Sequence, residues 1–147
     1  MATEQRFTKP GTTLNDLEIA WFDRLTDADA LMTSGRHASA IVMGLFSLEI
    51  LLKVFICRKL AIKHLPRAFE IHDLDGLLLL SGLSSRINEK TEFPVRANWS
   101  FLVRSSERLN EMRYSANSGW SQNDAVEFFD QLRGEPNGVL TWLLRQQ

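Results

Sequence analysis

The chain of 147 residues is close to the size of one folded domain, and its 44% hydrophobic and 24% charged residues are an ordinary globular balance. We therefore expect a single domain over residues 1–147, in which residues 1–12 form a flexible N-terminal segment. The formal net charge of −1 provides no general attraction for nucleic acid, so such binding would need a local basic patch.

Two long helices are predicted in the first half of the chain. Thr12 and Thr13, followed by Asp16, supply an N-cap and a first-turn acid, and apolar residues then recur at three- and four-residue steps, which predicts a helix over residues 14–33. Ser34 and Gly35 interrupt this pattern. The next helix, which is predicted to end near Ala61, carries a wide apolar face and is expected to be the central helix of the fold.

Shorter helices are predicted next. A third helix begins near His72 and is ended by Gly82, which lowers helix propensity. Residues 84–90 are expected to form a loop or a single turn. A fourth helix, from about Arg96 to Tyr114, is predicted from apolar residues that again follow a helical stripe.

The last predicted helix begins at a capping-box pattern, in which Ser121 is followed three residues later by Asp124. Gly134, Pro136 and Gly138 interrupt the segment, yet apolar residues keep their helical phase across them, which favours one kinked helix over two. No segment shows the two-residue alternation of a strand. The sequence thus predicts an all-α fold, an antiparallel up-and-down bundle of four to five helices.

Few residues are suited to metal or covalent chemistry. The only cysteine, Cys57, lies in an apolar run and is expected to be a buried small hydrophobe. His37, His64 and His72 are scattered and have no cysteine pair beside them, so no metal and no other cofactor are expected. No GxSxG, HExxH or P-loop pattern is present, which leaves three common catalytic templates without support.

Neither export nor membrane insertion is expected. Residues 1–10 lack the apolar centre of a secretory signal. Residues 41–57 are the one stretch apolar enough to test as a membrane span, but Glu49 and Lys53 interrupt it, and two ionisable groups near the middle of a bilayer would be costly. The predicted location is cytoplasmic.

Glu49 and Lys53 are the most informative charged residues of the central helix. Their i, i+4 spacing, with the acid on the N-terminal side, favours an ion pair on one flank of the helix. Ionisable groups in so apolar a helix must find partners, so the two side chains could instead line a polar pocket or a dimer seam. The sequence leaves both interpretations open.

A basic segment follows the central helix. It consists of Arg58, Lys59, Lys63, His64 and Arg67. Cations at a helix C-terminus are favoured by the helix dipole, which accounts for the first two residues. The loop residues remain candidates for phosphate contact.

Four sequence blocks carry a family resemblance through their order and spacing. They are residues 47–53 (SLEILLK), residues 72–79 (HDLDGLLL), the pair Arg113 and Tyr114, and residues 123–129 (NDAVEFF). Together they resemble the HEPN family of small helical-bundle proteins, which is named for its occurrence in higher eukaryotes and prokaryotes and for proposed nucleotide binding. The resemblance extends over most of the chain, although the four blocks themselves are short.

The resemblance implies a four- or five-helix bundle that pairs as a homodimer, with a polar cleft shared by the two copies. Many active members are metal-independent ribonucleases, whose signature is an arginine followed after four to six residues by a histidine, at the turn into the final helix. Arg113 occupies the place of that arginine. Chains with the Arg-Tyr form resemble members found in toxin–antitoxin pairs or defence systems.

The motif histidine is missing from this sequence. The residues after Arg113 are Tyr-Ser-Ala-Asn-Ser-Gly-Trp, so the general base or acid of the family signature is not there. Imidazole is the side chain whose ordinary pKa suits proton transfer near neutrality, and neither Tyr114 nor Asn117 readily replaces it. This departure predicts a domain without ribonuclease activity, unless His72 completes a composite site.

Three functions remain open from the sequence. The leading hypothesis is a non-catalytic HEPN-like domain that dimerises and binds a nucleotidyltransferase-type partner protein, an RNA or a nucleotide. The second is a ribonuclease in which Arg113 steadies the phosphate charge while His72 or Tyr114 transfers protons, and the third is a structural bundle unrelated to the family. The candidate ligand- or partner-binding residues are Arg113, Tyr114, Glu49, Lys53 and His72, with Arg113 as the anion contact.

Overall fold

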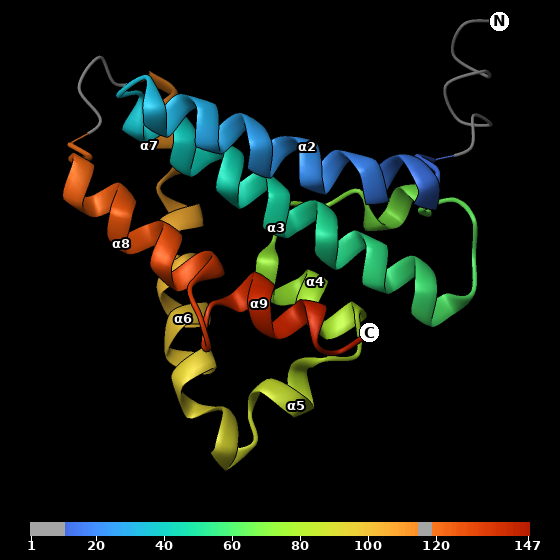
Figure 1. Ribbon diagram of the computed structural model, residues 1–147. Coiled ribbons are helices and arrows are strands. Elements are labelled where there is room, and N and C mark those ends of the chain that lie inside the picture. The colour runs from blue at the N-terminus through green and yellow to red at the C-terminus, as the bar shows by residue number, and fades with distance from the viewer. Residues whose placement is uncertain (1–10, 115–118) are drawn as a thin grey trace, which may run out of the picture.

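The computed structural model describes residues 11–114 and 119–147, and it is built from helices (Figure 1). The α-helices are α2 (Leu14–Thr33), α3 (His37–Leu60), α4 (Leu74–Leu80), α5 (Ser84–Ile87), α6 (Phe93–Glu107), α7 (Leu109–Tyr114), α8 (Gln122–Arg133) and α9 (Val139–Leu144). Two 3₁₀ turns, η1 (Arg67–Phe69) and η2 (Lys90–Glu92), lie between them. The described residues contain no β-strand, which confirms the predicted all-α class. The segment 1–12, predicted to be flexible, lies almost wholly outside the described residues.

The first two helices form the hairpin that the sequence predicts. The hydroxyl of Thr13 accepts a hydrogen bond from the backbone N–H of Asp16 at 3.1 Å, which caps α2 at its predicted start. Gly35 turns the chain with a φ of 74°, a conformation that glycine adopts without steric cost. An isolated bridge between Thr13 and His64 then ties the loop after α3 back to the start of α2.

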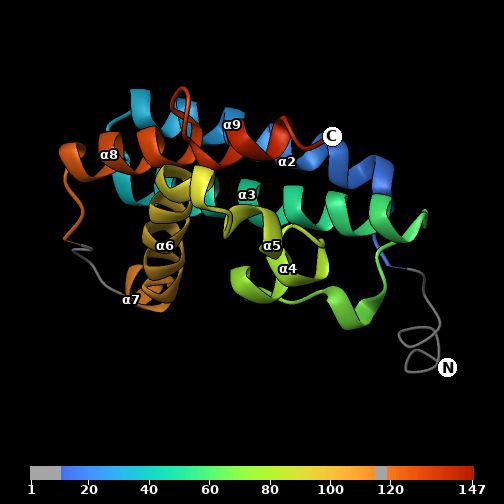
Figure 2. The same ribbon diagram turned by 90° about the horizontal axis from the view of Figure 1, so that it is seen from below.

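Helix α3 is the central helix of the fold. It packs against α2, α4 and α8, and Figures 1 and 2 show it running through the middle of the molecule in both views. Fourteen of its 24 residues are buried, including Leu48, Leu51 and Leu52 with no exposed surface. Its wide apolar face therefore forms the core of the protein, as predicted.

The length and composition of α3 would also allow it to cross a membrane, since its mean hydropathy reaches 2.2. However, 78% of its most apolar stretch is buried inside the protein. The core helix of a soluble protein shows this kind of burial, so the structure gives only weak support for a span.

Cys57 lies on α3 with no exposed surface, which confirms the predicted burial. Burial raises the pKa of its thiol, because the low-dielectric surroundings disfavour the thiolate. The thiolate is the reactive form of cysteine, so this residue is a poor nucleophile in the folded protein.

The predicted fourth helix, from about Arg96 to Tyr114, is two helices in the structure. It begins earlier, at Phe93, because Pro94 occupies the first turn, where its missing N–H is not needed. It then breaks at Arg108, whose N–H bonds the carbonyls of residues 105 and 106. No glycine or proline marks this break in the sequence. Helix α6 runs steeply across α3 in both views (Figures 1 and 2).

The prediction of one kinked C-terminal helix is wrong, because the chain forms α8 and α9 with a loop between them. The predicted capping box is present: Ser121 and Asp124 bond each other's backbone N–H groups at 2.8 and 3.2 Å. The backbone leaves the helical region at Gly134, where ψ is 155°, and again at Gly138. After the loop, α9 packs back on α6 and α8, so its apolar residues are buried. Their spacing matches the helical phase of α8, and the sequence pattern alone therefore does not distinguish a second helix from a continuation of the first.

Candidate functional site

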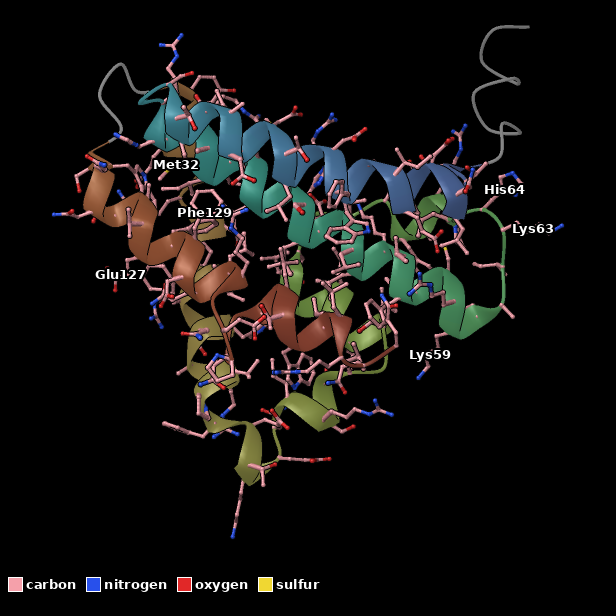
Figure 3. All side chains as sticks on the ribbon, in the orientation of Figure 1. Met32, Lys59, Lys63, His64, Glu127 and Phe129 are labelled. Carbon is pink, nitrogen blue, oxygen red and sulfur yellow. The ribbon has the colours of Figure 1, made fainter. Side chains whose placement is uncertain are left out.

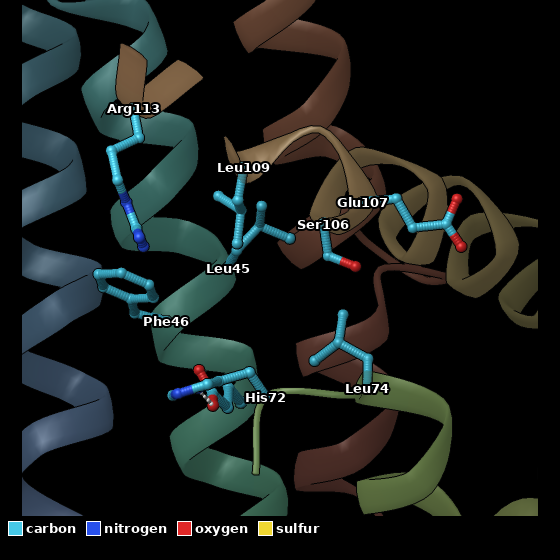
Figure 4. Close-up of a pocket in the computed structure, with 9 residues that line it drawn as sticks. Leu45, Phe46, His72, Leu74, Ser106, Glu107, Leu109 and Arg113 are labelled. Carbon is cyan, nitrogen blue, oxygen red and sulfur yellow. Dashed lines mark hydrogen bonds and ion pairs between the residues drawn. The ribbon is translucent and has the colours of Figure 1, made fainter. Parts of the chain in front are cut away.

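A pocket of about 510 Å³ lies between α3, the segment before α4 and the junction of α6 with α7 (Figure 4). It is lined by Leu45, Phe46, Glu49, His72, Leu74, Ser106, Glu107, Leu109 and Arg113. Leucine side chains form part of the wall, and the charged groups come from three separate segments of the chain. A concave apolar wall with a few convergent polar groups is the usual form of a small-molecule site.

Local structure explains how three distant segments reach one pocket. Glu49 follows Leu45 by one helical turn, so both side chains lie on one face of α3. The break at Arg108 starts a new helix, and Leu109 and Arg113 then share a face of α7 by the same four-residue spacing. His72 comes from the extended segment that precedes the N-cap of α4.

Glu49 is the hub of the polar groups. Its Oε1 accepts a hydrogen bond from Lys53 Nζ at 3.1 Å and lies 2.5 Å from His72 Nδ1. The side chains of Glu49 and Lys53 are each 10% exposed, whereas that of His72 is 85% exposed. The carboxylate is thus held at the base of the pocket, with the ammonium group on one side and the imidazole on the solvent side.

The Glu49 contact fixes the orientation of the His72 ring. A carboxylate can only accept, so the proton of this hydrogen bond is carried by His72 Nδ1. In the neutral imidazole this leaves Nε2 as a bare acceptor, and in the cation Nε2 is a donor. A carboxylate–imidazole pair of this kind is the arrangement used for general acid–base catalysis, and it is also a simple means of placing a hydrogen-bonding group.

Arg113 supplies positive charge at the other end of the pocket. Figure 4 shows its side chain reaching from α7 toward the ring of Phe46, with His72, the partner of Glu49, on the far side of that ring. Within the described residues, no carboxylate forms an ion pair with Arg113, and the carboxylate of Glu107 points away from it (Figure 4). The guanidinium group is therefore available to an anion from outside.

The structure brings together four of the five predicted site residues. Glu49, His72 and Arg113 line the pocket, and Lys53 bonds Glu49, so the predicted i, i+4 ion pair is confirmed. His72 does not cap α4, because Asp73 occupies that N-cap. Tyr114 is 81% exposed and does not line the pocket. Asn117, the other residue considered for the missing histidine, lies outside the described residues.

Phe46 was missed as a site residue in the sequence. It lies three residues before Glu49 on α3, so helical phase alone could have placed both side chains on the same side of the helix. Ser106 and Leu109 depend on the helix break at Arg108 and had no comparable signal.

The basic segment after α3 lies elsewhere. Arg58 forms an ion pair with Glu18 of α2 at 2.8 Å, so its charge is neutralised within the fold. Figure 3 shows Lys59, Lys63 and His64 spread around the end of α3 and the loop that follows. All three residues are exposed, and the side chain of Lys59 lies over Gly82. Across residues 11–114 and 119–147, no group of three or more histidine, cysteine or acidic side chains is placed to hold a metal ion.

Comparison with protein-family models, with curated proteins and with solved structures found no match to this chain. What the chain does is therefore inferred from the pocket and from the residues that line it.

Proposed function

We propose that this chain is a non-catalytic, HEPN-like helical domain that binds a phosphate-bearing ligand, an RNA or a nucleotide, in the pocket of Arg113. One observation carries the proposal. Three ionisable residues that the family resemblance singled out come from separate parts of the chain and line one pocket, and Arg113 has no acidic partner among the described residues.

The charges of the pocket favour an anion. The Lys53 ammonium group neutralises the Glu49 carboxylate within the fold. Glu107 also lines the pocket, but Figure 4 shows its carboxylate directed away from Arg113, whose guanidinium group therefore faces the pocket without an ion-pair partner among the described residues. A planar guanidinium group binds phosphate through two parallel charge-assisted hydrogen bonds. His72 adds a hydrogen-bonding group whose position is fixed by Glu49.

Phe46 favours a ligand that carries a base as well as a phosphate. Its ring lies between Arg113 and His72 in Figure 4, and an aromatic face of this kind stacks on nucleobases without regard to sequence. The pocket volume of about 510 Å³ is within the range of small-molecule sites. A single nucleotide, free or within an RNA strand, combines both features.

The wider setting of the proposal follows from the family resemblance. We expect the helices to form the HEPN type of bundle, the chain to pair as a homodimer, and the pair to act in the cytoplasm with a nucleotidyltransferase-type partner in a toxin–antitoxin or defence system. The exposed side chains of His72 and Arg113 support a site that a second protein or an RNA can reach.

Replacing Arg113 by glutamine tests the proposal. Loss of a charged hydrogen-bonding group is expected to weaken binding of a labelled single-stranded RNA by about tenfold to a hundredfold, with competition by adenosine or guanosine monophosphate lost in parallel. Fluorescence anisotropy at low ionic strength measures both. Arg104→Gln is the matched control, because Arg104 is exposed on α6 and does not line the pocket. Equal losses in the two variants would contradict a specific site.

A second candidate, a metal-independent ribonuclease, is favoured by the contact between His72 and Glu49. The 2.5 Å contact provides the oriented imidazole that the sequence lacks after Arg113, and both groups line the same pocket. In this alternative His72 transfers the proton and Arg113 stabilises the developing charge on the phosphate.

A digest of labelled RNA in the presence of a chelator separates the two candidates. The non-catalytic proposal predicts that the protein binds the RNA and leaves its length unchanged, even at high protein concentration. Cleavage that is lost in both His72→Gln and Arg113→Gln, but kept in Arg104→Gln, would show that the chain is a ribonuclease and not a non-catalytic binding domain. Gel electrophoresis of the products over time is the readout.

A further inference from the structure

The outer face of α2 carries an exposed stripe without charge. Asn15, Ile19, Phe22, Thr26 and Thr33 recur at steps of four, three, four and seven residues, which places them along one side of the helix. Ile19 is 55% exposed and Phe22 is 59% exposed. Figure 1 shows α2 along the upper edge of the molecule, beyond α3.

The stripe is separate from the face that builds the core. Leu17 and Ala28 are the buried residues of α2, and they lie on the side that packs on α3. The ring of Phe22 also meets the ring of Trp21 edge to face, with centroids 5.8 Å apart. An exposed aromatic side chain that already rests against a neighbour loses less conformational freedom when a partner covers it.

Acidic residues flank the stripe on both sides. On one side, Glu18 and Asp29 are neutralised by Arg58 of α3 and Arg133 of α8. On the other side, Asp16, Asp23 and Asp27 form a row at seven- and four-residue spacing. Only Asp27 in this row has an ion-pair partner among the described residues, which is Arg24 on the same helix. Asp16 and Asp23 therefore present uncompensated negative charge beside exposed apolar surface.

This charge distribution decides which occupant fits. Helix α2 has five acidic residues and one arginine, so two copies packed through this stripe would set acids against acids in either relative direction. Nucleic acid is repelled for the same reason. A helix with leucine-type residues on one face and lysine or arginine on its flank matches both the stripe and the row of carboxylates.

We propose that the Ile19–Phe22 stripe of α2, with the carboxylates of Asp16 and Asp23 beside it, docks a basic amphipathic helix of another protein. The surface is on a different helix from the Arg113 pocket, and the proposal does not depend on what that pocket binds. It assigns α2 a role beyond packing on α3. The aromatic ring provides the anchor, and the acids select the charge of the partner.

A synthetic helix of about 18 residues built from leucine, alanine and lysine is the probe, and the same helix with glutamate in place of lysine is its control. Backbone NMR shifts of the labelled full chain locate the contact, and calorimetry gives the affinity. We expect the lysine helix to shift signals of α2, and the Ile19→Glu/Phe22→Glu variant to weaken binding by about tenfold or more. The Asp16→Asn/Asp23→Asn variant should weaken it less and should reduce its dependence on salt.

Val126→Glu is the matched surface variant, because Val126 is 55% exposed on α8, away from the stripe. It should bind the lysine helix as the unmodified chain does. Circular dichroism of each variant verifies the fold, and Phe22→Ser replaces the double variant if that protein does not fold. Equal binding of the lysine and glutamate helices, or shifts confined to other helices, would overturn the proposal. Self-association through α2, detected by sedimentation and lost in Phe22→Ser, would overturn it as well.

Discussion

The Glu49→Leu variant is expected to lower the free energy of unfolding by about 3–5 kcal/mol. The change leaves the ammonium group of Lys53 in a site where only 10% of its side chain is exposed, without the carboxylate that accepts its hydrogen bond. An uncompensated charge in the interior is far more costly than the loss of an exposed ion pair. Urea unfolding followed by circular dichroism measures the change.

The double variant Glu49→Leu/Lys53→Met is the control for this expectation. Removal of both charges leaves two apolar side chains in an apolar helix, so the stability should return to within about 1–2 kcal/mol of the unmodified chain. A double variant as unstable as Glu49→Leu would show that packing around position 49, and not the charge of Lys53, determines the loss. The double variant also removes the carboxylate that holds the ring of His72. It should therefore keep most of its stability while His72 loses its fixed orientation in the pocket.

Replacing Phe128 by alanine should lower stability by about 3–5 kcal/mol, because a fully buried ring leaves a cavity where α8 meets α3. The absence of a side chain at Gly44 is what allows this close contact. A β-carbon at position 44 would lie 2.8 Å from Phe128 Cε1 and 3.1 Å from Leu132 Cδ2. Gly44→Leu alone is therefore expected to cost about 1–3 kcal/mol through overpacking.

The two changes should compensate each other when combined. A leucine at position 44 can occupy the space that Phe128→Ala vacates, so the double variant should lose clearly less stability than the two single losses added together. Thermal and urea unfolding of the four proteins give the interaction energy directly. Additive losses would mean that α8 does not rest on α3 at Gly44.

The helices could be predicted from the sequence where they depend on interactions between residues that are close together in the chain. The cap at Thr13, the capping box at Ser121 and the Glu49–Lys53 pair all involve groups three or four residues apart, and all are present in the structure. The central position of α3 followed from its wide apolar face. These features depend on local spacing and hydrophobicity, which the sequence states directly.

Features that depend on the packing of distant segments could not be read in the same way. The break at Arg108 has no glycine or proline to mark it, and the loop at Gly134 was hidden by apolar residues that keep a helical phase across it. The same limit applies to the site. His72 lies 23 residues from Glu49 in the chain, so only the folded path from α3 to α4 reveals their contact.

The residues that the family resemblance singled out differ in where the structure places them. It pointed to Arg113 through its place before the last helical segment, and the structure adds the pocket in which its side chain lies. It also pointed to Tyr114, whose side chain is directed to solvent. Phe46 shows the reverse case, since it lines the pocket although nothing in the family pattern singled it out.

The most direct test of the proposal that a nucleotide binds in the pocket of Arg113 is an NMR titration. Isotope-labelled protein is titrated with adenosine or guanosine monophosphate, and the side-chain signals of Arg113 and His72 are followed. We predict that both signals move together with a single dissociation constant, and that the His72 signal no longer responds in Arg113→Gln. Signals of Arg113 and His72 that stay fixed while the nucleotide binds elsewhere on the chain would contradict the claim.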